Sequence, residues 1–197
     1  MARARTGDKD SKLVEAAISL FLERSVRGTT MQHIARRAGV AVGTVYLYYK
    51  DKGAIVRRVA FAFAEQHDAF AEGVLGTRRG PRRKLLDYIL GFYDMWVPFG
   101  QNDQGAVELA EAVLTHAPET PGIAQQKFLD TVAAILQEGK ERDWKVGNPQ
   151  VEARWIALST TAFFPLAGTP SEHPLRQSLG REELEGLLKW MLDKVEN

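Results

Sequence analysis

The spacing of apolar residues is the feature of this sequence that most constrains its fold. Apolar side chains recur at intervals of three and four residues along most of the 197-residue chain, and we find no convincing strand-like alternation. Such intervals bring side chains to one face of an α-helix. The sequence therefore predicts an all-α protein built from amphipathic helices.

Capping residues and helix breakers divide this pattern into about nine helices. Thr30 suits an N-cap, and Gly39 is expected to end the helix that follows. Pro81 suits the first turn of a later helix, which Pro98 and Gly100 are expected to end. The expected helices span about 10–24, 30–38, 42–49, 52–75, 81 to between 98 and 100, 103–116, 120 onward, 149–167 and 181–195.

Charge is distributed unevenly along the chain. Residues 1–58 contain 12 lysines and arginines against five aspartates and glutamates, although the whole chain has a formal net charge of +1. A basic segment joined to an acidic remainder indicates that one end meets a polyanion, although a basic patch is often plain solvated surface. We expect a DNA-binding domain over residues 1–52 and a larger domain over residues 53–197.

Two short helices separated by a glycine turn make residues 30–49 a candidate helix-turn-helix, whose second helix enters the major groove of DNA. If Val45 and Tyr49 face the core, the helical repeat turns their neighbours outward or to the flanks. A glycine backbone can approach the groove closely, hydroxyls can bond to bases or phosphates, leucine can contact a thymine methyl, and lysine can pair with phosphate. The residues so placed are Gly43, Thr44, Tyr46, Leu47 and Lys50. The alternative is a pair of packed helices that binds no DNA.

The segment from Leu13 to Val59 resembles the DNA-binding domain of the TetR family of bacterial repressors. The resemblance covers about a quarter of the chain and rests on Ala16-Ala17, Leu20-Phe21, Glu23-Arg24, Thr29-Thr30, Ile34-Ala35, Ala38-Gly39-Val40, Gly43-Thr44, Tyr46, Tyr48 and Lys52. It implies an all-α homodimer with a helix-turn-helix head and a ligand-binding, dimerising body. It also implies that a small-molecule effector regulates binding to the DNA operator.

The family's DNA contacts carry over to matching positions of this chain. The resemblance implies that Thr30 at the start of the first helix of the pair contacts DNA. It implies the same for Thr44, Tyr46 and Tyr48 in the second helix, and it implies that Lys52 holds a phosphate. The full set of predicted DNA-binding residues is Thr30, Val42, Gly43, Thr44, Tyr46, Leu47, Tyr48, Lys50 and Lys52.

The sequence also departs from the family pattern in its head. The departures are Ser25 in place of a usual glycine, His33 in place of an acid, Ala41 in place of a capping serine, Val42 in place of a polar residue, and Leu47 in place of histidine. Fewer polar side chains are then left to read bases. Direct readout is therefore expected to rest on Thr44, Tyr46 and the backbone.

Aromatic residues recur in and around the expected fifth, seventh and eighth helices, which enclose the ligand pocket in the family. An aromatic lining suits a largely apolar or planar ligand, whereas the alternative for each side chain is an ordinary core position. The candidate ligand-binding residues are Phe92, Trp96, Phe99, Phe128, Trp155 and Phe163.

The last two expected helices are the predicted dimer interface. The segment 149–167 is apolar almost all round, so it can bury one side in its own core and the other in a partner. Dimerisation would fix the separation of two heads on a palindromic operator. A ligand that shifts the helix over residues 52–75 would change that separation and release a repressor from DNA.

Other functional classes find little support. The chain has no cysteine, its four histidines have no metal-ligand spacing, and there is no phosphate-binding loop or nucleophile elbow. We therefore expect no enzyme, no cofactor and no metal.

No apolar run is long enough for a membrane span and the N-terminus lacks a signal peptide, so we expect a cytoplasmic protein that joins the nucleoid when bound to DNA. A helical protein-interaction module that does not bind DNA is the alternative. Arg3 and Arg5 could form a basic DNA-binding arm, but we favour a loose chain start.

Overall fold

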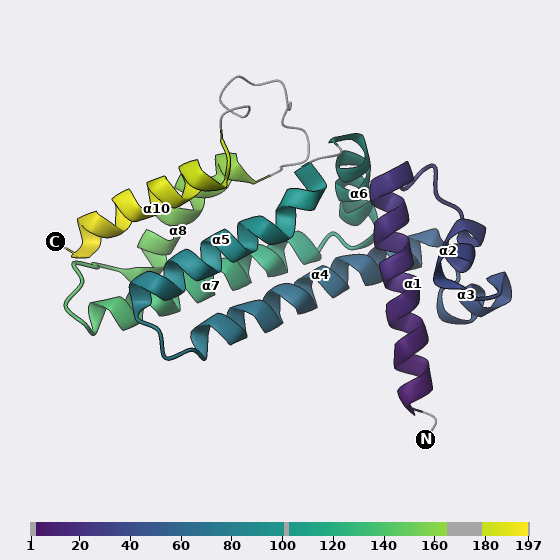
Figure 1. Ribbon diagram of the computed structural model, residues 1–197, viewed down its shortest axis with the longest axis horizontal. Coiled ribbons are helices and arrows are strands. Elements are labelled where there is room, and N and C mark those ends of the chain that lie inside the picture. The colour runs from purple at the N-terminus through teal and green to yellow at the C-terminus, as the bar shows by residue number, and fades with distance from the viewer. Residues whose placement is uncertain (1–2, 101–102, 165–178, 197) are drawn as a thin grey trace. The chain divides into compact units, whose positions relative to one another are not determined.

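The computed structural model describes the backbone of residues 3–100, 103–164 and 179–196, and within these ranges the side chains of 9–96, 104–164 and 179–195. The described residues form nine α-helices and one 3₁₀ turn, without a strand, which confirms the predicted all-α class (Figure 1). The elements are α1 (Arg3–Arg24), α2 (Met31–Ala38), α3 (Val42–Tyr48), α4 (Lys52–Leu75), α5 (Pro81–Gly100), α6 (Asp103–His116), α7 (Thr120–Lys140), α8 (Pro149–Thr160), η1 (Thr161–Phe163) and α10 (Arg181–Glu196).

The chain divides into two compact units. The head unit comprises residues up to Glu65 together with 101–121, and the body unit comprises 66–100 together with the residues from 122 onward. This division differs from the boundary predicted after Lys52, for two physical reasons. Helix α4 runs without a break from Lys52 to Leu75, and α6 packs against α1.

The head unit has its own core, formed by α1 to α3 and the first turns of α4. Its fully buried side chains are Leu13, Ala17, Phe21, Ile34, Val45, Ile55 and Val59. Each apolar side chain of this size that leaves water contributes roughly 1.5–3 kcal/mol to folding. This core holds α2 and α3 in place although each has only a few turns, too short to be stable alone in water.

The body unit encloses a second core between α5, α7, α8, α10 and the end of α4. The largest fully buried side chains there are Tyr88, Leu85, Ile89, Ile135, Leu136, Leu184, Leu188 and Leu192. They belong to one buried cluster, to which α5, α7 and α10 contribute most of these side chains.

Several helix ends differ from those predicted. Helix α1 begins at Arg3 and not near Asp10. The sequence did not indicate this start, because the first turns are polar and carry no apolar pattern. Helix α5, by contrast, ends at Gly100, one of the two residues expected to end it, and Pro98 lies in its last turn. Helix α8 ends at Thr160, where hydroxyls of three successive residues bond to carbonyls of the preceding turn. Residues 165–167 of the predicted helix lie outside the described residues.

Candidate functional site

Helix α2 begins with a reciprocal cap. The Thr30 hydroxyl accepts from the His33 backbone N–H at 3.2 Å, and the His33 ring nitrogen Nδ1 accepts from the Thr30 backbone N–H at 3.3 Å. This reciprocal pair of hydrogen bonds is a capping box. His33 therefore replaces the acid that is usual in the family, because any acceptor at the third helical position can complete such a box.

The turn between α2 and α3 depends on one glycine. Gly39 caps α2 with φ 68°, in the left-handed region, and its N–H bonds back to the helix. Helix α3 then starts at Val42 behind Ala41, whose side chain makes no capping hydrogen bond. Ser25, which stands where the family usually has glycine, also has a positive φ, of 65°. This backbone conformation explains why glycine is usual at that position.

Helix α3 presents an exposed, mostly apolar face. Val45 is fully buried and Tyr49 is 7% exposed, so both point inward as predicted. Tyr46 and Leu47 point outward with 53% and 85% exposure, respectively. Gly43 is also exposed and faces open space, because a Cβ built there meets no atom within 4 Å.

The remaining predicted contacts flank this face to different degrees. Thr30 is exposed, and Val42, Thr44 and Tyr48 are half-buried. The Lys50 side chain is 86% exposed and lies 4.0 Å from the Asp51 carboxylate. Seven predicted residues thus lie within or just after α3, while Thr30 lies at the start of α2.

Lys52 has a different environment. Its ammonium group donates to the carbonyl oxygens of Val26 at 2.6 Å and Thr29 at 3.0 Å, and its side chain is half-buried. It therefore ties the first turn of α4 to the loop between α1 and α2. Sequence reasoning missed this structural role, because the two carbonyls lie more than 20 residues away along the chain.

Polar contacts hold α3 against its neighbours. The Tyr49 hydroxyl donates to the Asp10 carboxylate, and Arg58 Nε donates to the same carboxylate at 3.3 Å. Burial, followed by the hydrogen bond to Asp10, raises the pKa of Tyr49, so the phenol keeps its proton. These contacts join α1, the end of α3 and α4, and so fix the angle at which α3 leaves the head.

A second polar contact joins α1 to α2. The Arg37 guanidinium nitrogens Nη1 and Nη2 both donate to the Glu23 carboxylate, at 2.8 and 2.7 Å. The hydrogen bond from Arg37, with a smaller contribution from Ser19, lowers the pKa of Glu23 to about 2. Because Arg37 is occupied in this way, the basic charge counted in the sequence overstates the charge that is free to meet a polyanion.

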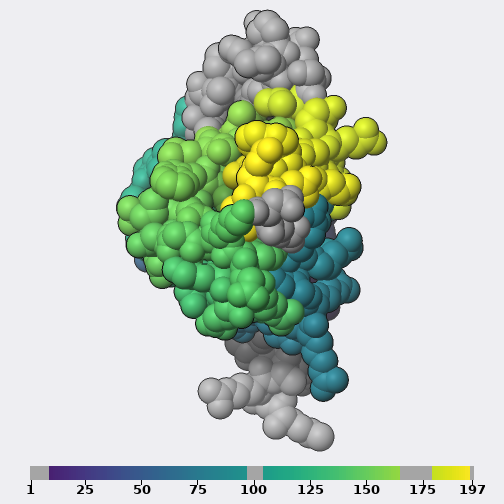
Figure 2. Space-filling view, turned by 90° about the vertical axis from the view of Figure 1, so that its left-hand side faces the viewer, coloured from purple at the N-terminus to yellow at the C-terminus, as the bar shows by residue number. Residues whose placement is uncertain are grey.

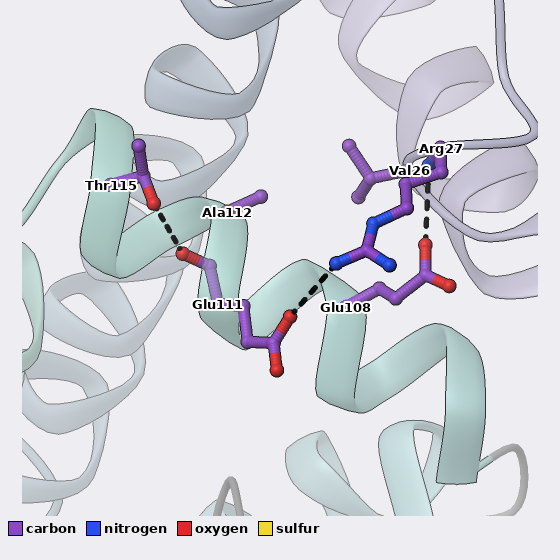
Figure 3. A pocket seen from close by; sticks show the side chains of 6 residues that line it. All are labelled: Val26, Arg27, Glu108, Glu111, Ala112 and Thr115. Atoms are coloured by element: carbon purple, nitrogen blue, oxygen red, sulfur yellow. Dashed lines mark hydrogen bonds and ion pairs between the residues drawn. The ribbon is translucent and has the colours of Figure 1, made fainter.

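A small pocket lies in the head unit between the α1–α2 loop and α6 (Figure 3). The Glu108 carboxylate accepts from the Arg27 backbone N–H at 3.2 Å, and the Arg27 guanidinium lies 3.5 Å from Glu111. Hydrogen bonds from Ser25 and from the Arg27 backbone lower the pKa of Glu108. These contacts bind α6 to the loop that leads into α2.

Comparison with known proteins identifies this head. Residues 13–59 match the sequence profile described as "Bacterial regulatory proteins, tetR family". This match identifies residues 13–59 as a head of the TetR-family type. The resemblance noted in the sequence is thereby confirmed, and since TetR-family proteins are DNA-binding regulators, so is the expectation that the chain is not an enzyme.

Curated relatives align with only part of this chain. The HTH-type transcriptional repressor KstR2 of Mycolicibacterium smegmatis is 24% identical over 91 residues, which are 46% of this chain and 44% of that protein. The HTH-type transcriptional regulator TtgR of Pseudomonas putida is 34% identical over 61 residues, 31% of this chain and 29% of that protein. The aligned stretches thus span less than half of either relative.

A solved structure extends the likeness of fold to nearly the whole chain. A TetR-family transcriptional regulator from Agrobacterium tumefaciens matches with a TM-score of 0.66 over 96% of this chain and 98% of that one, at 12% identity. At this low identity the match shows the fold alone.

The body unit brings some of the predicted ligand-binding residues together. Phe92 lies at the centre of an aromatic cluster, with ring centroids 5.2 Å from Phe128, 6.0 Å from Trp96 and 5.2 Å from Phe164. Phe163 is half-buried and packs against the same core. The side chain of Phe99 lies outside the described residues.

Trp155 is placed elsewhere. Its side chain is 60% exposed on α8, together with Leu158 at 73% and Val151 at 36%. The same helix buries Ala153 and Ile156 on its inner side. Figure 2 shows α8 in light green and α10 in yellow side by side on one face of the body unit. Helix α10 adds Trp190 at 61% exposure.

Two polar residues in the aromatic cluster were missed by sequence reasoning. His67 of α4 and Tyr88 of α5 are buried, and His67 Nε2 lies 2.7 Å from the Tyr88 hydroxyl. Burial lowers the pKa of His67 to about 4, so its ring is neutral at neutral pH. No sequence signal marked them, because a single histidine among scattered aromatics has no recognisable spacing.

Among the described residues, no helix is long and apolar enough to cross a membrane.

Proposed function

We propose that the protein is a homodimeric transcriptional repressor that binds operator DNA through α3 and is released by a small, largely apolar or aromatic ligand. The observation that carries the proposal is the exposed face of α3, on a head of the TetR family. A leucine that is 85% exposed on a packed helix has no role in the core. A partner that buries it would explain its presence.

The major groove supplies such a partner. Tyr46 and Thr44 would bond to base edges or phosphates, Leu47 would contact a thymine methyl, and Lys50 would pair with phosphate. Gly43 would let the α3 backbone approach the groove closely. Lys52 can still offer its remaining N–H to a phosphate, although two of its donors are used within the head.

Dimerisation would bring two such heads onto one operator. The outer face of α8 exposes Val151, Trp155 and Leu158, and α10 exposes Trp190. Large apolar side chains gathered on neighbouring helices favour a second copy of the chain as their partner. A two-fold dimer reads a palindromic site whose half-sites lie about 34–36 Å apart, or a multiple of this spacing.

Ligand control would act through α4, which contributes residues to both units. A ligand bound among the aromatic residues of the body would release DNA only if it bound more tightly to the form of the dimer whose two heads do not fit the operator. Moving the population from mostly bound to mostly free takes about 5.5 kcal/mol of such preference. We place the protein in the bacterial cytoplasm, at the nucleoid when it is bound to DNA.

The proposal is tested by selection of bound fragments from the DNA of the source organism. Purified protein should enrich a short palindromic sequence, including fragments beside its own gene, and Tyr46→Ala should enrich none. Equal recovery of all fragments by both proteins would instead support the alternative, a helical interaction module without sequence-specific DNA binding.

A further inference from the structure

The loop between α1 and α2 is held from two sides by side chains of other helices. Lys52 of α4 donates to the carbonyl oxygens of Val26 and Thr29 at 2.6 and 3.0 Å. Glu108 of α6 accepts from the backbone N–H of Arg27 at 3.2 Å, as Figure 3 shows. These three backbone groups lie within four consecutive residues, so both side chains act on the same short segment.

This segment leads directly into two of the predicted DNA contacts. Thr30, which follows Thr29 in the chain, is exposed and caps α2. The Lys52 ammonium group lies against the loop carbonyls, so the position of the loop also sets the point from which Lys52 can reach a phosphate. A displacement of the loop would therefore move both predicted contacts at once.

Helix α6 is itself fixed within the head unit. It packs against α1, and its Leu109 is buried. At the other end of α6, Arg57 Nη1 of α4 donates to the His116 carbonyl at 3.1 Å. Residues 101–121 accordingly belong to the head unit, although the family profile matches residues 13–59 only. The packing of the head thus determines where Glu108 lies.

The neighbouring acid on α6, Glu111, makes a different kind of contact. Its carboxylate lies 3.5 Å from the Arg27 guanidinium, and both side chains are exposed. An ion pair so open to water adds little stability. Glu108 instead accepts from the main chain, and a hydrogen bond to a carboxylate is stronger than one between neutral groups. Of these two acids, only Glu108 constrains the backbone of the loop.

We propose that Glu108 is a positioning residue for operator binding, which holds the α1–α2 loop in the arrangement that DNA recognises. The inference rests on the proposed function and adds to it a residue outside the set of predicted DNA contacts. If the loop is released, only a fraction of the molecules has the binding arrangement, and the apparent operator affinity falls by that fraction. By linkage, operator binding must in turn strengthen the hold on the loop.

Operator affinities of matched variants test this role. Full-length wild type and variants are titrated with the selected palindrome, at a temperature at which circular dichroism shows each of them to be folded. Since one hydrogen bond is lost, Glu108→Ala should bind about three- to tenfold more weakly. Glu108→Gln keeps an acceptor oxygen and should retain most of the affinity. Glu111→Ala removes the same charge from the same helix and should not weaken binding.

The sign of the effect separates positioning from charge. DNA is a polyanion, so removal of an acid that acts only through its charge would raise operator affinity or leave it unchanged. A loss in Glu108→Ala is therefore opposite to the electrostatic expectation. The slope of log affinity against log salt should keep its wild-type value, because no phosphate contact is removed.

Hydrogen exchange in the wild type tests the linkage without a variant. The Arg27 amide should exchange more slowly when the palindrome is bound than in the free protein, because operator binding favours the held loop. A random duplex of equal length should slow this exchange less.

The outcomes distinguish failure of this inference from failure of the proposed function. Unchanged operator affinity in Glu108→Ala, an equal loss in Glu111→Ala, or unchanged exchange of the Arg27 amide would overturn the inference and leave operator binding by α3 intact. A wild type that does not prefer the palindrome to a random duplex would overturn the proposed function, and the inference with it.

Discussion

Gly39 and Gly43 lie four residues apart in the head, yet the backbone requires glycine at only one of them. Gly39 has φ 68°, where a Cβ costs about 1–2 kcal/mol. Gly43 lies in the first turn of α3, has no positive φ and has open space where a Cβ would stand. The fold does not explain Gly43, whereas the proposed close approach of DNA would explain it.

Alanine at these two positions should therefore have opposite effects. Gly43→Ala should stabilise the protein by up to about 1 kcal/mol, because alanine is the better helix former, while it weakens operator binding. Gly39→Ala should destabilise it by about 1–2 kcal/mol. Chemical denaturation measures the change in stability of both variants, and DNA titration measures their operator affinity. Unchanged operator affinity in Gly43→Ala would contradict the close approach.

Lys50 and Lys52 are also expected to differ in role, one in operator binding and the other in the stability of the head. Lys50 is exposed, so Lys50→Ala should reduce the slope of log affinity against log salt by about one and leave the unfolding free energy unchanged. Lys52 binds two carbonyls, so Lys52→Ala should lower that free energy by about 1–3 kcal/mol. A salt series and a denaturation curve for each variant check both. If the two variants behaved alike, the structural role assigned to Lys52 would be wrong.

At the scale of elements, helices with strong local signals were predicted accurately and others were not. The starts of α2 and α4 and both ends of α6 lie where caps, glycines and prolines placed them. The start of α1 and the end of α8 were missed, because polar helical turns and hydroxyl-rich ends leave no apolar period. Residues that meet only through tertiary contacts, such as His67 and Tyr88, could not be paired from a single sequence.

The His67 contact between α4 and α5 predicts a pH dependence of stability. The folded pKa is about 4, and the unfolded pKa is near 6.5. Between these values the unfolded chain binds more protons, so stability is present above about pH 6.5 and is lost as the pH falls toward 4. The loss should reach about 1–3 kcal/mol.

Denaturation curves of the wild type and His67→Phe across this range isolate the effect. Carboxylates titrate in both proteins, so only the difference between them reports on His67. A difference that stays constant from pH 7 to pH 4 would show that folding does not lower the pKa of His67.

At the scale of the whole molecule, the account depends on a dimer. Trp155→Glu on α8 would place a charge in the proposed interface and should convert the dimer to monomer, with at least a tenfold loss of operator affinity. Leu114→Glu makes the same kind of change at an exposed position of α6 and serves as the control. Analytical ultracentrifugation measures both. A dimer that survives Trp155→Glu at low micromolar concentration would place the interface elsewhere.

Operator binding by α3 is the central claim, and a DNA titration across a salt series tests it most directly. The selected palindrome and a random duplex of equal length are titrated with the wild type and with Tyr46→Ala. The account predicts tight binding to the palindrome that falls steeply with salt, since each phosphate contact adds about 0.9 to the slope. It also predicts a loss of tenfold or more in Tyr46→Ala, because a base contact is worth about 1–3 kcal/mol. Equal affinity for both duplexes, or full affinity in Tyr46→Ala, would contradict it.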